Sequence, residues 1–174
     1  MRRTIKAAAA AFAVIIGTAA MATPAAASQA AGGVGTQIYG YITNLHSGLC
    51  VAVAGGSTAN NAQIVQYYCD GESSRFWQLE GLGGGLYYIR NLKSGKCLAI
   101  AGGSTAGNAL AVLFPCDGHI SRKWRLHDRG GGNFHIINAN SNLCLTVQNA
   151  STAPNAKVLQ YPCNTTWPHN ETWW

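Results

Sequence analysis

Hydrophobic and polar positions alternate in short runs from about residue 38 onward, and no segment of helical length there repeats its apolar residues every 3.6 positions. Gly, Asn, Ser and Pro, which favour turns, bound these runs. The pattern predicts an all-β domain with four strands in each of three successive segments. The expected strands lie near residues 38–45, 49–53, 63–68 and 75–80, then 86–92, 96–100, 110–114 and 122–126, then 133–139, 143–147, 157–161 and 172–174.

The three segments are copies of one unit. A shift of 47 residues superimposes SGLC, SGKC and SNLC, and also the loops STANNA, STAGNA and STAPNA, which begin at Ser57, Ser104 and Ser151. The copies span about 38–82, 85–129 and 132–174, and the runs Gly83-Gly84-Gly85 and Gly130-Gly131-Gly132 between them predict tight turns with positive φ.

Equivalent apolar positions predict the core. One copy cannot bury its apolar face alone, so three copies are expected to share a core, with twelve short strands around a pseudo-threefold axis. The predicted core residues are Ile42, Ile89 and Ile136, then Val51, Leu98 and Leu145, then Val53, Ile100 and Val147, and finally Trp77, Trp124 and Trp173.

The six cysteines follow the same repeat, with the two of each copy 19 residues apart. Fifteen pairings are possible, and the symmetry favours one disulfide in each copy. A zinc site would need Cys and His clustered at short spacing, which the chain lacks. The predicted bonds are Cys50–Cys69, Cys97–Cys116 and Cys144–Cys163.

Residues 1–27 have the pattern of a secretory signal peptide: a basic start, an apolar stretch over 7–22 and an Ala-x-Ala site at 25–27. Export by the general or the twin-arginine route is compatible with it. Residues 28–37 are expected to form a flexible arm. Without the leader the chain has 147 residues, nine basic and six acidic, and this scattered charge does not favour a nucleic-acid partner. We expect an extracellular protein.

The repeated motif is similar to that of a known family. Each copy has S-[GN]-x-C followed by alternating apolar residues, a polar STA-x-N-A loop, an aromatic residue two positions before the second Cys, and a closing x-x-W. This unit resembles the ricin-type lectin repeat, and the resemblance covers about residues 38–174. It implies a β-trefoil fold and carbohydrate binding at up to three shallow, equivalent sites.

The cysteines also suggest a register. If the two cysteines of a copy face each other in an antiparallel pair, a small residue lies opposite an aromatic one on the outward face, and Val51 and Val53 point inward. The predicted outward pairs are Ala52 with Tyr67, Ala99 with Phe114, and Thr146 with Tyr161.

Two departures from the family pattern make the three sites unequal. The resemblance implies an Asp where this chain has Ala52, Ala99 and Thr146, and a Gln where it has Arg75, Arg122 and Glu171. The third copy is expected to offer the best site, then the first, then the second. The candidate residues are Thr146, Tyr161, His169, Asn170 and Glu171 in the third copy, Tyr67, Asp70, Glu72 and Arg75 in the first, and Phe114 and Asp117, near His119, in the second.

Structural interpretations compete with these functional ones. The aromatic residues can instead pack against the small residue opposite. Asn61, Asn108 and Asn155 are interpreted as turn formers, since Asn tolerates the left-handed conformation. Gln66 and Gln160 are interpreted as buried amides bonded to backbone.

The few carboxylates do not favour an enzyme. Glycoside hydrolysis uses a carboxylate pair, and the chain after the leader has only six acidic residues, all on expected loops or strand ends. The leading prediction is a secreted, monomeric lectin that binds a glycan or polysaccharide weakly at several sites. It includes no catalytic residue, metal, cofactor, nucleic acid or membrane insertion. The alternatives are a protein-binding trefoil such as a protease inhibitor, and a trefoil scaffold that has lost sugar binding.

Overall fold

A computed structural model describes residues 39–164 and 170–174, and these contain eleven β-strands and no α-helix. The expected leader (1–27), the arm (28–37) and His169 lie outside the described residues. None of the described helices is long and apolar enough to cross a membrane. The strands are β1 Cys50–Val53, β2 Ile64–Tyr67, β3 Trp77–Gly83, β4 Leu86–Asn91, β5 Cys97–Ile100, β6 Ala111–Phe114, β7 Lys123–Gly130, β8 Asn133–Asn138, β9 Cys144–Val147, β10 Val158–Tyr161 and β11 Thr172–Trp173.

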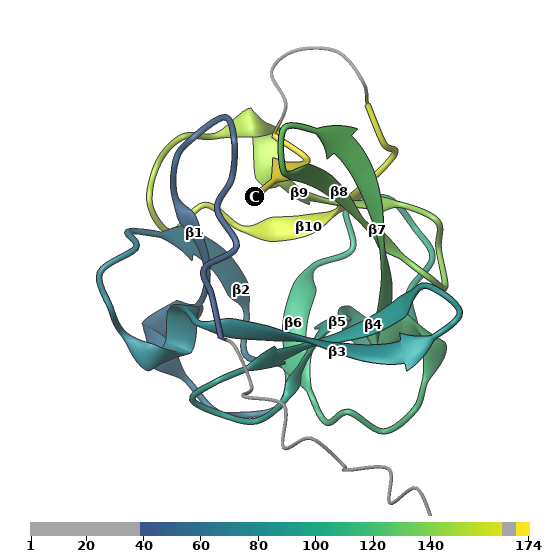
Figure 1. The fold of residues 1–174 in the computed structure, drawn as a ribbon. Helices are drawn as coiled ribbons and strands as arrows, with labels where there is room; N and C mark the ends of the chain where they lie inside the picture. Colours follow the sequence, from purple (N-terminus) through teal and green to yellow (C-terminus); the bar gives the residue numbers. More distant parts are fainter. Residues whose placement is uncertain (1–38, 165–169) are drawn as a thin grey trace, which may run out of the picture. The chain divides into compact units, whose positions relative to one another are not determined.

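Strand pairing follows the threefold repeat (Figure 1). Within the repeats β1 pairs with β2, β5 with β6, and β9 with β10, all antiparallel. Between repeats, β3 forms a hairpin with β4 and β7 with β8. The strands β2, β6 and β10, one from each repeat, contact one another pairwise. This arrangement is the predicted β-trefoil.

The inter-repeat hairpins turn at the glycine runs. Gly83, Gly84 and Gly85 have φ of 82°, 59° and 75°, a region that side chains with a Cβ rarely adopt. The predicted turns are therefore confirmed. The strands β3 and β7 run to Gly83 and Gly130, farther than predicted, with a register shift just before each turn.

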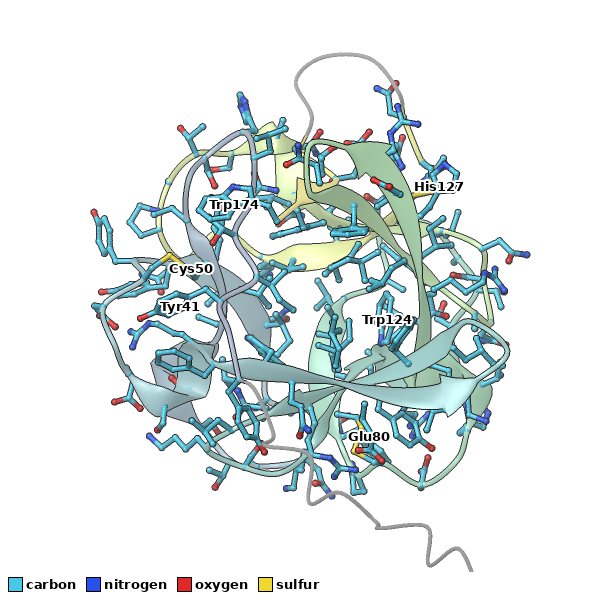
Figure 2. The ribbon with its side chains drawn as sticks, viewed as in Figure 1. Tyr41, Cys50, Glu80, Trp124, His127 and Trp174 are labelled. Carbon is cyan, nitrogen blue, oxygen red and sulfur yellow. A yellow bond between two sulfur atoms is a disulfide. The ribbon has the colours of Figure 1, made fainter. Side chains whose placement is uncertain are left out.

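The core consists of the repeated apolar positions, as predicted. Trp124 lies in the interior (Figure 2), and its indole Nε1 donates to the Leu98 carbonyl over 2.9 Å. Trp77 and Trp173 donate in the same way to Val51 and Leu145, both at 2.9 Å. Ile42, which was expected to match the buried Ile89 and Ile136, is only partly buried.

Two details of the strand prediction are wrong. Residues 39–45 form isolated bridges at Gly40, Thr43 and Asn44 instead of the continuous strand expected over 38–45. The pairing register is also displaced by two residues.

Each first cysteine lies opposite the aromatic residue: Cys50 opposite Tyr67, Cys97 opposite Phe114, and Cys144 opposite Tyr161. Ala52, Ala99 and Thr146 consequently lie opposite Val65, Val112 and Leu159. The second cysteine follows the end of its strand, so the disulfide joins it diagonally to the first. A two-residue shift preserves the alternation of side chains between the two faces, because side chains alternate with a period of two. Ala52, Ala99 and Thr146 are nevertheless buried, at 2%, 1% and 4% exposure, so the outward exposure predicted for them is wrong.

The three predicted disulfides are present, with Cα–Cα distances of 5.4, 5.2 and 5.0 Å. The structural interpretations of the repeated Asn and Gln residues are also confirmed. Asn61, Asn108 and Asn155 have φ of 62°, 64° and 66°. Gln66 and Gln160 are fully buried, and each side-chain amide bonds two backbone carbonyls of a neighbouring repeat.

Candidate functional site

The third repeat contains a cavity of about 450 Å³ beside its disulfide, which we call the repeat-3 cavity. Strand β9 contributes Thr146, β10 ends in Tyr161, and Asn170 and Glu171 precede β11. All four predicted residues line the cavity. Its other lining side chains include Asn108, Gln148, Asn149 and Asn164.

Hydrogen bonds fix the polar wall of this cavity. Asn170 Nδ2 donates to Thr146 Oγ1 over 2.6 Å and to the Val147 carbonyl over 3.1 Å. The backbone N–H of Asn164 donates to Glu171 Oε1 over 3.0 Å. Glu171 is only 4% exposed, so its carboxylate is held in a fixed position at the edge of the cavity. A preorganised carboxylate and several amides can bond hydroxyl groups with little loss of side-chain entropy.

Tyr161 presents an open aromatic face in this cavity. Its side chain is 50% exposed. Among residues 39–164 and 170–174, no Arg or Lys stacks on its ring. Glu171 occupies the repeat position that holds arginine in the other two copies. An uncovered ring of this kind can pack against the apolar face of a pyranose.

The first repeat has a cavity of about 400 Å³, the repeat-1 cavity, lined by the predicted Tyr67, Glu72 and Arg75. The Arg75 guanidinium lies over the Tyr67 ring, 4.8 Å from its centroid. Asp70 is not among the lining residues, and its Oδ1 lies 2.8 Å from Arg75 Nη1. The aromatic face that a sugar would need is therefore covered by a side chain of the protein itself.

A second ion pair also borders the repeat-1 cavity. Lys93 Nζ lies 3.1 Å from Glu72 Oε1. This hydrogen bond and the positive charge of Lys93 lower the pKa of Glu72 below its ordinary value. Glu72 is thus charged at neutral pH, and Lys93 is held beside the cavity.

The second repeat has the same covered arrangement as the first. The Arg122 guanidinium lies over the Phe114 ring at 4.4 Å, and its Nε is 3.2 Å from Asp117 Oδ1. Arg122 Nη1 also donates to Ser121 Oγ over 2.6 Å. His119, predicted to lie nearby, accepts a hydrogen bond from the Ser121 N–H. Arg122 thus contacts both Phe114 and Asp117, and its guanidinium covers a face of the Phe114 ring.

The sequence of the chain matches a known protein family. The family described as ricin-type beta-trefoil lectin domain-like matches residues 30–114, 75–161 and 120–174. The chain belongs to this family. No curated protein matches the chain significantly.

Solved structures similar to this ricin-type domain include a designed protein, a lectin and part of an enzyme. ThreeFoil, a designed threefold symmetric protein, is 32% identical, with a TM-score of 0.75 over 78% of this chain and 95% of that one. An exo-beta-1,3-galactanase from Clostridium thermocellum is 29% identical, with a TM-score of 0.75 over 79% of this chain but only 29% of the enzyme. The Rhizoctonia solani agglutinin, at 22% identity, shares the fold, with a TM-score of 0.68 over 78% of this chain and 90% of that one. The family, a lectin-like one, supports carbohydrate binding as the general function.

Several residues that line the cavities of this ricin-type domain were not predicted from the sequence. Asn108 lines the repeat-3 cavity from the second repeat, and Asn155 lines the repeat-1 cavity from the third. Lys93 reaches the repeat-1 cavity from the second repeat. Each cavity therefore takes side chains from a neighbouring repeat.

The arginine stacking did have a signal in the sequence. Asp70 occurs with Arg75 and Asp117 with Arg122, whereas Asn164 occurs with Glu171 at the same repeat positions. The acidic residue is present in the two repeats that have the arginine and absent in the repeat that lacks it, and this pattern indicates an ion pair between them.

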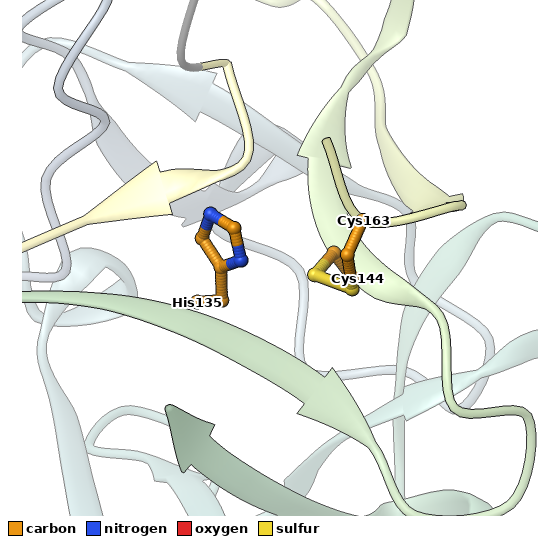
Figure 3. Close-up of side chains that lie close together, drawn as sticks. All are labelled: His135, Cys144 and Cys163. Atoms are coloured by element: carbon orange, nitrogen blue, oxygen red, sulfur yellow. A yellow bond between two sulfur atoms is a disulfide. The ribbon is translucent and has the colours of Figure 1, made fainter. Parts of the chain in front are cut away.

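A cluster outside the cavities includes two residues of the third disulfide. His135 lies against the bond between Cys144 and Cys163, with the ligand atoms of the three residues within 4.8 Å of one another (Figure 3). Metal ions bind cysteine as the thiolate, and a disulfide sulfur is not a thiolate. The cluster is therefore interpreted as packing of an imidazole against a disulfide.

One lining residue of the repeat-3 cavity has a strained backbone, and this leads to a stability prediction. Ala150, in the 3-10 turn Gln148–Ala150, has φ of 49°, whereas its equivalents Gly56 and Gly103 are glycines. Because a Cβ in the left-handed region costs about 1–2 kcal/mol, we expect Ala150→Gly to stabilise the protein by about 0.5–1 kcal/mol in urea unfolding.

Two control variants separate this strain from a general effect of glycine. Gly103→Ala should destabilise by about 1–2 kcal/mol, because its new Cβ would also lie 3.2 Å from His119 Cε1. Ala101→Gly, in the equivalent turn but without positive φ, should destabilise the fold. A loss of stability in Ala150→Gly would contradict the strain.

Proposed function

We propose that the protein is a secreted, non-enzymatic lectin whose main saccharide site is the repeat-3 cavity. The observation that carries this proposal is the contrast between the exposed Tyr161 ring and the arginine-covered rings of Tyr67 and Phe114. A bound pyranose would pack its apolar face on Tyr161. Its hydroxyl groups would bond the Glu171 carboxylate and the amides that line the cavity.

Glu171 can supply the carboxylate acceptor that the family pattern implies at the position of Thr146. In the family pattern a carboxylate is expected two positions after the first cysteine, and Thr146 stands there. Both residues line the same cavity. We therefore assign to Glu171 the role of principal acceptor for two neighbouring hydroxyl groups.

Binding rather than hydrolysis also fits the charge of this cavity. Among its described lining residues, Glu171 is the one carboxylate. Glycosidases require two carboxyl groups that act as acid and as base or nucleophile. A cavity with a single carboxylate can hold a sugar but lacks the second group.

Secretion is part of the proposal. The basic and apolar pattern of residues 1–27 supports export, and so do the three disulfides, which persist in oxidising compartments. The saccharide would thus be a glycan or polysaccharide outside the cell.

The experiment is a glycan array with plant and microbial polysaccharides, probed with oxidised protein (residues 28–174) and its Glu171→Gln variant. The wild type should bind a set of saccharides, and the variant should bind the same set about tenfold more weakly, as expected for loss of a charged acceptor. An array without signal from folded, oxidised wild-type protein would contradict the proposal. Inhibition of a protease by such protein would favour the protein-binding alternative.

A further inference from the structure

The repeat-1 cavity differs in charge from the repeat-3 cavity. Its charged lining residues are Glu72, Arg75 and Lys93, two cations and one anion. The repeat-3 cavity has the single anion Glu171. Two cavities of similar size on the same fold therefore present opposite charge to a ligand.

Lys93 is specific to this cavity. The equivalent positions in the other repeats are His46 and Asn140, so Lys93 is the one residue of the three with a permanent positive charge. Its partner is Glu72, and the side chains are 38% and 44% exposed. Exposed ion pairs contribute little free energy, so a ligand anion can compete with Glu72 for the ammonium group.

Arg75 provides the second cation in a fixed position. The Tyr67 ring supports one face of its guanidinium, and Asp70 contacts Nη1 from outside the set of residues that line the cavity. Its Nε is buried without a hydrogen-bond partner. A guanidinium has five N–H donors, so the contact with Asp70 leaves further donors for a second anion.

An exposed aromatic residue contacts Tyr67, which lines this cavity, although it is not itself a lining residue. The Tyr68 ring lies edge-on to Tyr67 with centroids 5.2 Å apart, and it is 55% exposed. The other repeats have Pro115 and Pro162 at this position, so the fold does not require an aromatic residue here. Tyr68 therefore offers an exposed aromatic surface next to Tyr67, on which further rings of a saccharide bound in the cavity can pack.

We propose that the repeat-1 cavity binds an anionic saccharide, a sugar bearing a carboxylate or sulfate group, through Arg75 and Lys93. This inference rests on the proposed lectin function but assigns the cavity a ligand class different from that of the repeat-3 cavity. The arginine that closes the Tyr67 face to a neutral sugar is here the group that binds the acid.

The test titrates residues 28–174 with an oligogalacturonide, a sulfated oligosaccharide, and a neutral saccharide that the array identifies. Calorimetry measures affinity, and NMR locates the perturbed residues. The acidic ligand should shift the signals of Tyr67 and Tyr68, and Lys93→Gln should weaken its binding about fivefold, as loss of one exposed charge contact predicts. Raising the salt concentration should weaken acidic binding far more than neutral binding.

Two controls separate this proposal from other effects. Arg129→Gln removes the same charge from the exposed end of β7 and should leave acidic binding unchanged. The variant Tyr68→Ala, which removes an exposed ring, should weaken the acidic ligand alone. Comparing the affinities of the oligogalacturonide and the sulfated oligosaccharide shows whether the cavity prefers a carboxylate or a sulfate group. Either preference supports the proposal.

The two proposals fail in different ways. Neutral binding at Tyr161 together with no acidic binding, or with equal losses in Lys93→Gln and Arg129→Gln, would overturn the inference for the repeat-1 cavity and leave the lectin proposal intact. Absence of binding by all three ligand classes would overturn both.

Discussion

Replacing Tyr161 by alanine should abolish detectable binding of neutral saccharides, whereas replacing Tyr67 should leave it unchanged. Tyr161 is 50% exposed in the repeat-3 cavity, and its ring is the aromatic face that we expect a pyranose to cover. Loss of this contact costs about 2 kcal/mol, or about 30-fold in affinity. Because the wild-type affinity is expected to be weak, the affinity of the variant would be too low for calorimetry to measure.

Tyr67→Ala is the matched control because Tyr67 holds the same repeat position under the Arg75 guanidinium. Both residues end their strands, and neither is part of the buried core. Similar losses of neutral binding in the two variants would contradict the distinction between open and covered rings. An unchanged affinity in Tyr161→Ala would remove the repeat-3 cavity as the saccharide site.

The second large effect concerns stability. Gln66→Ala should lower the free energy of unfolding by about 3 kcal/mol, since three hydrogen bonds of about 1 kcal/mol each are lost in the interior. The fully buried Gln66 side chain donates to the carbonyls of Ser151 and Ala153, both over 2.8 Å. It also accepts from Ser47 Oγ over 2.7 Å. The amide thus joins the first repeat to the third.

Thermal unfolding measured with the disulfides intact would show this loss as a decrease in Tm of about 10 °C. Gln66→Leu keeps the volume and reproduces Leu113, the equivalent residue of the second repeat. It should be less destabilising than alanine, because no cavity forms. A decrease in Tm of less than about 2 °C in Gln66→Ala would contradict the assigned role.

The second repeat has Leu113 in place of the buried glutamine, and Lys96 accounts for how it holds the neighbouring loop without this amide. The loop that Gln would hold there is the one beginning at Ser57, and Lys96 Nζ donates to the Thr58 carbonyl over 2.6 Å. Lys96 stands where the other repeats have Leu49 and Leu143. Lys96 therefore provides one hydrogen bond to this loop in place of those that a glutamine makes in the other two repeats.

Much of the fold followed from the sequence because its strongest signals are periodic. The cysteine spacing identified the disulfides, and the equivalent Val, Leu, Ile and Trp positions identified the core. The register was wrong because opposite cysteines were assumed, whereas Cys69 follows the end of β2. Bonded cysteines need nearby Cα atoms, and a diagonal pair satisfies this requirement as well as an opposite one.

The cavities were harder to predict, because residues of different repeats meet in them. Thr146, Tyr161, Asn170 and Glu171, which the sequence groups because they belong to one copy, line one cavity. The sequence did not place Asn108 in the same cavity, because that residue belongs to another copy. The loop asparagines were interpreted as turn formers, and the structure shows that one residue can both form a turn and line a cavity.

The most direct test of the central claim is an NMR titration of protein labelled at its aromatic rings, with the neutral saccharide that the array identifies. The account predicts that the ring signals of Tyr161 shift with saturation, while those of Tyr67 and Phe114 remain in place under their arginines. Equal shifts at Tyr67 or Phe114, or saccharide binding without any shift at Tyr161, would contradict it.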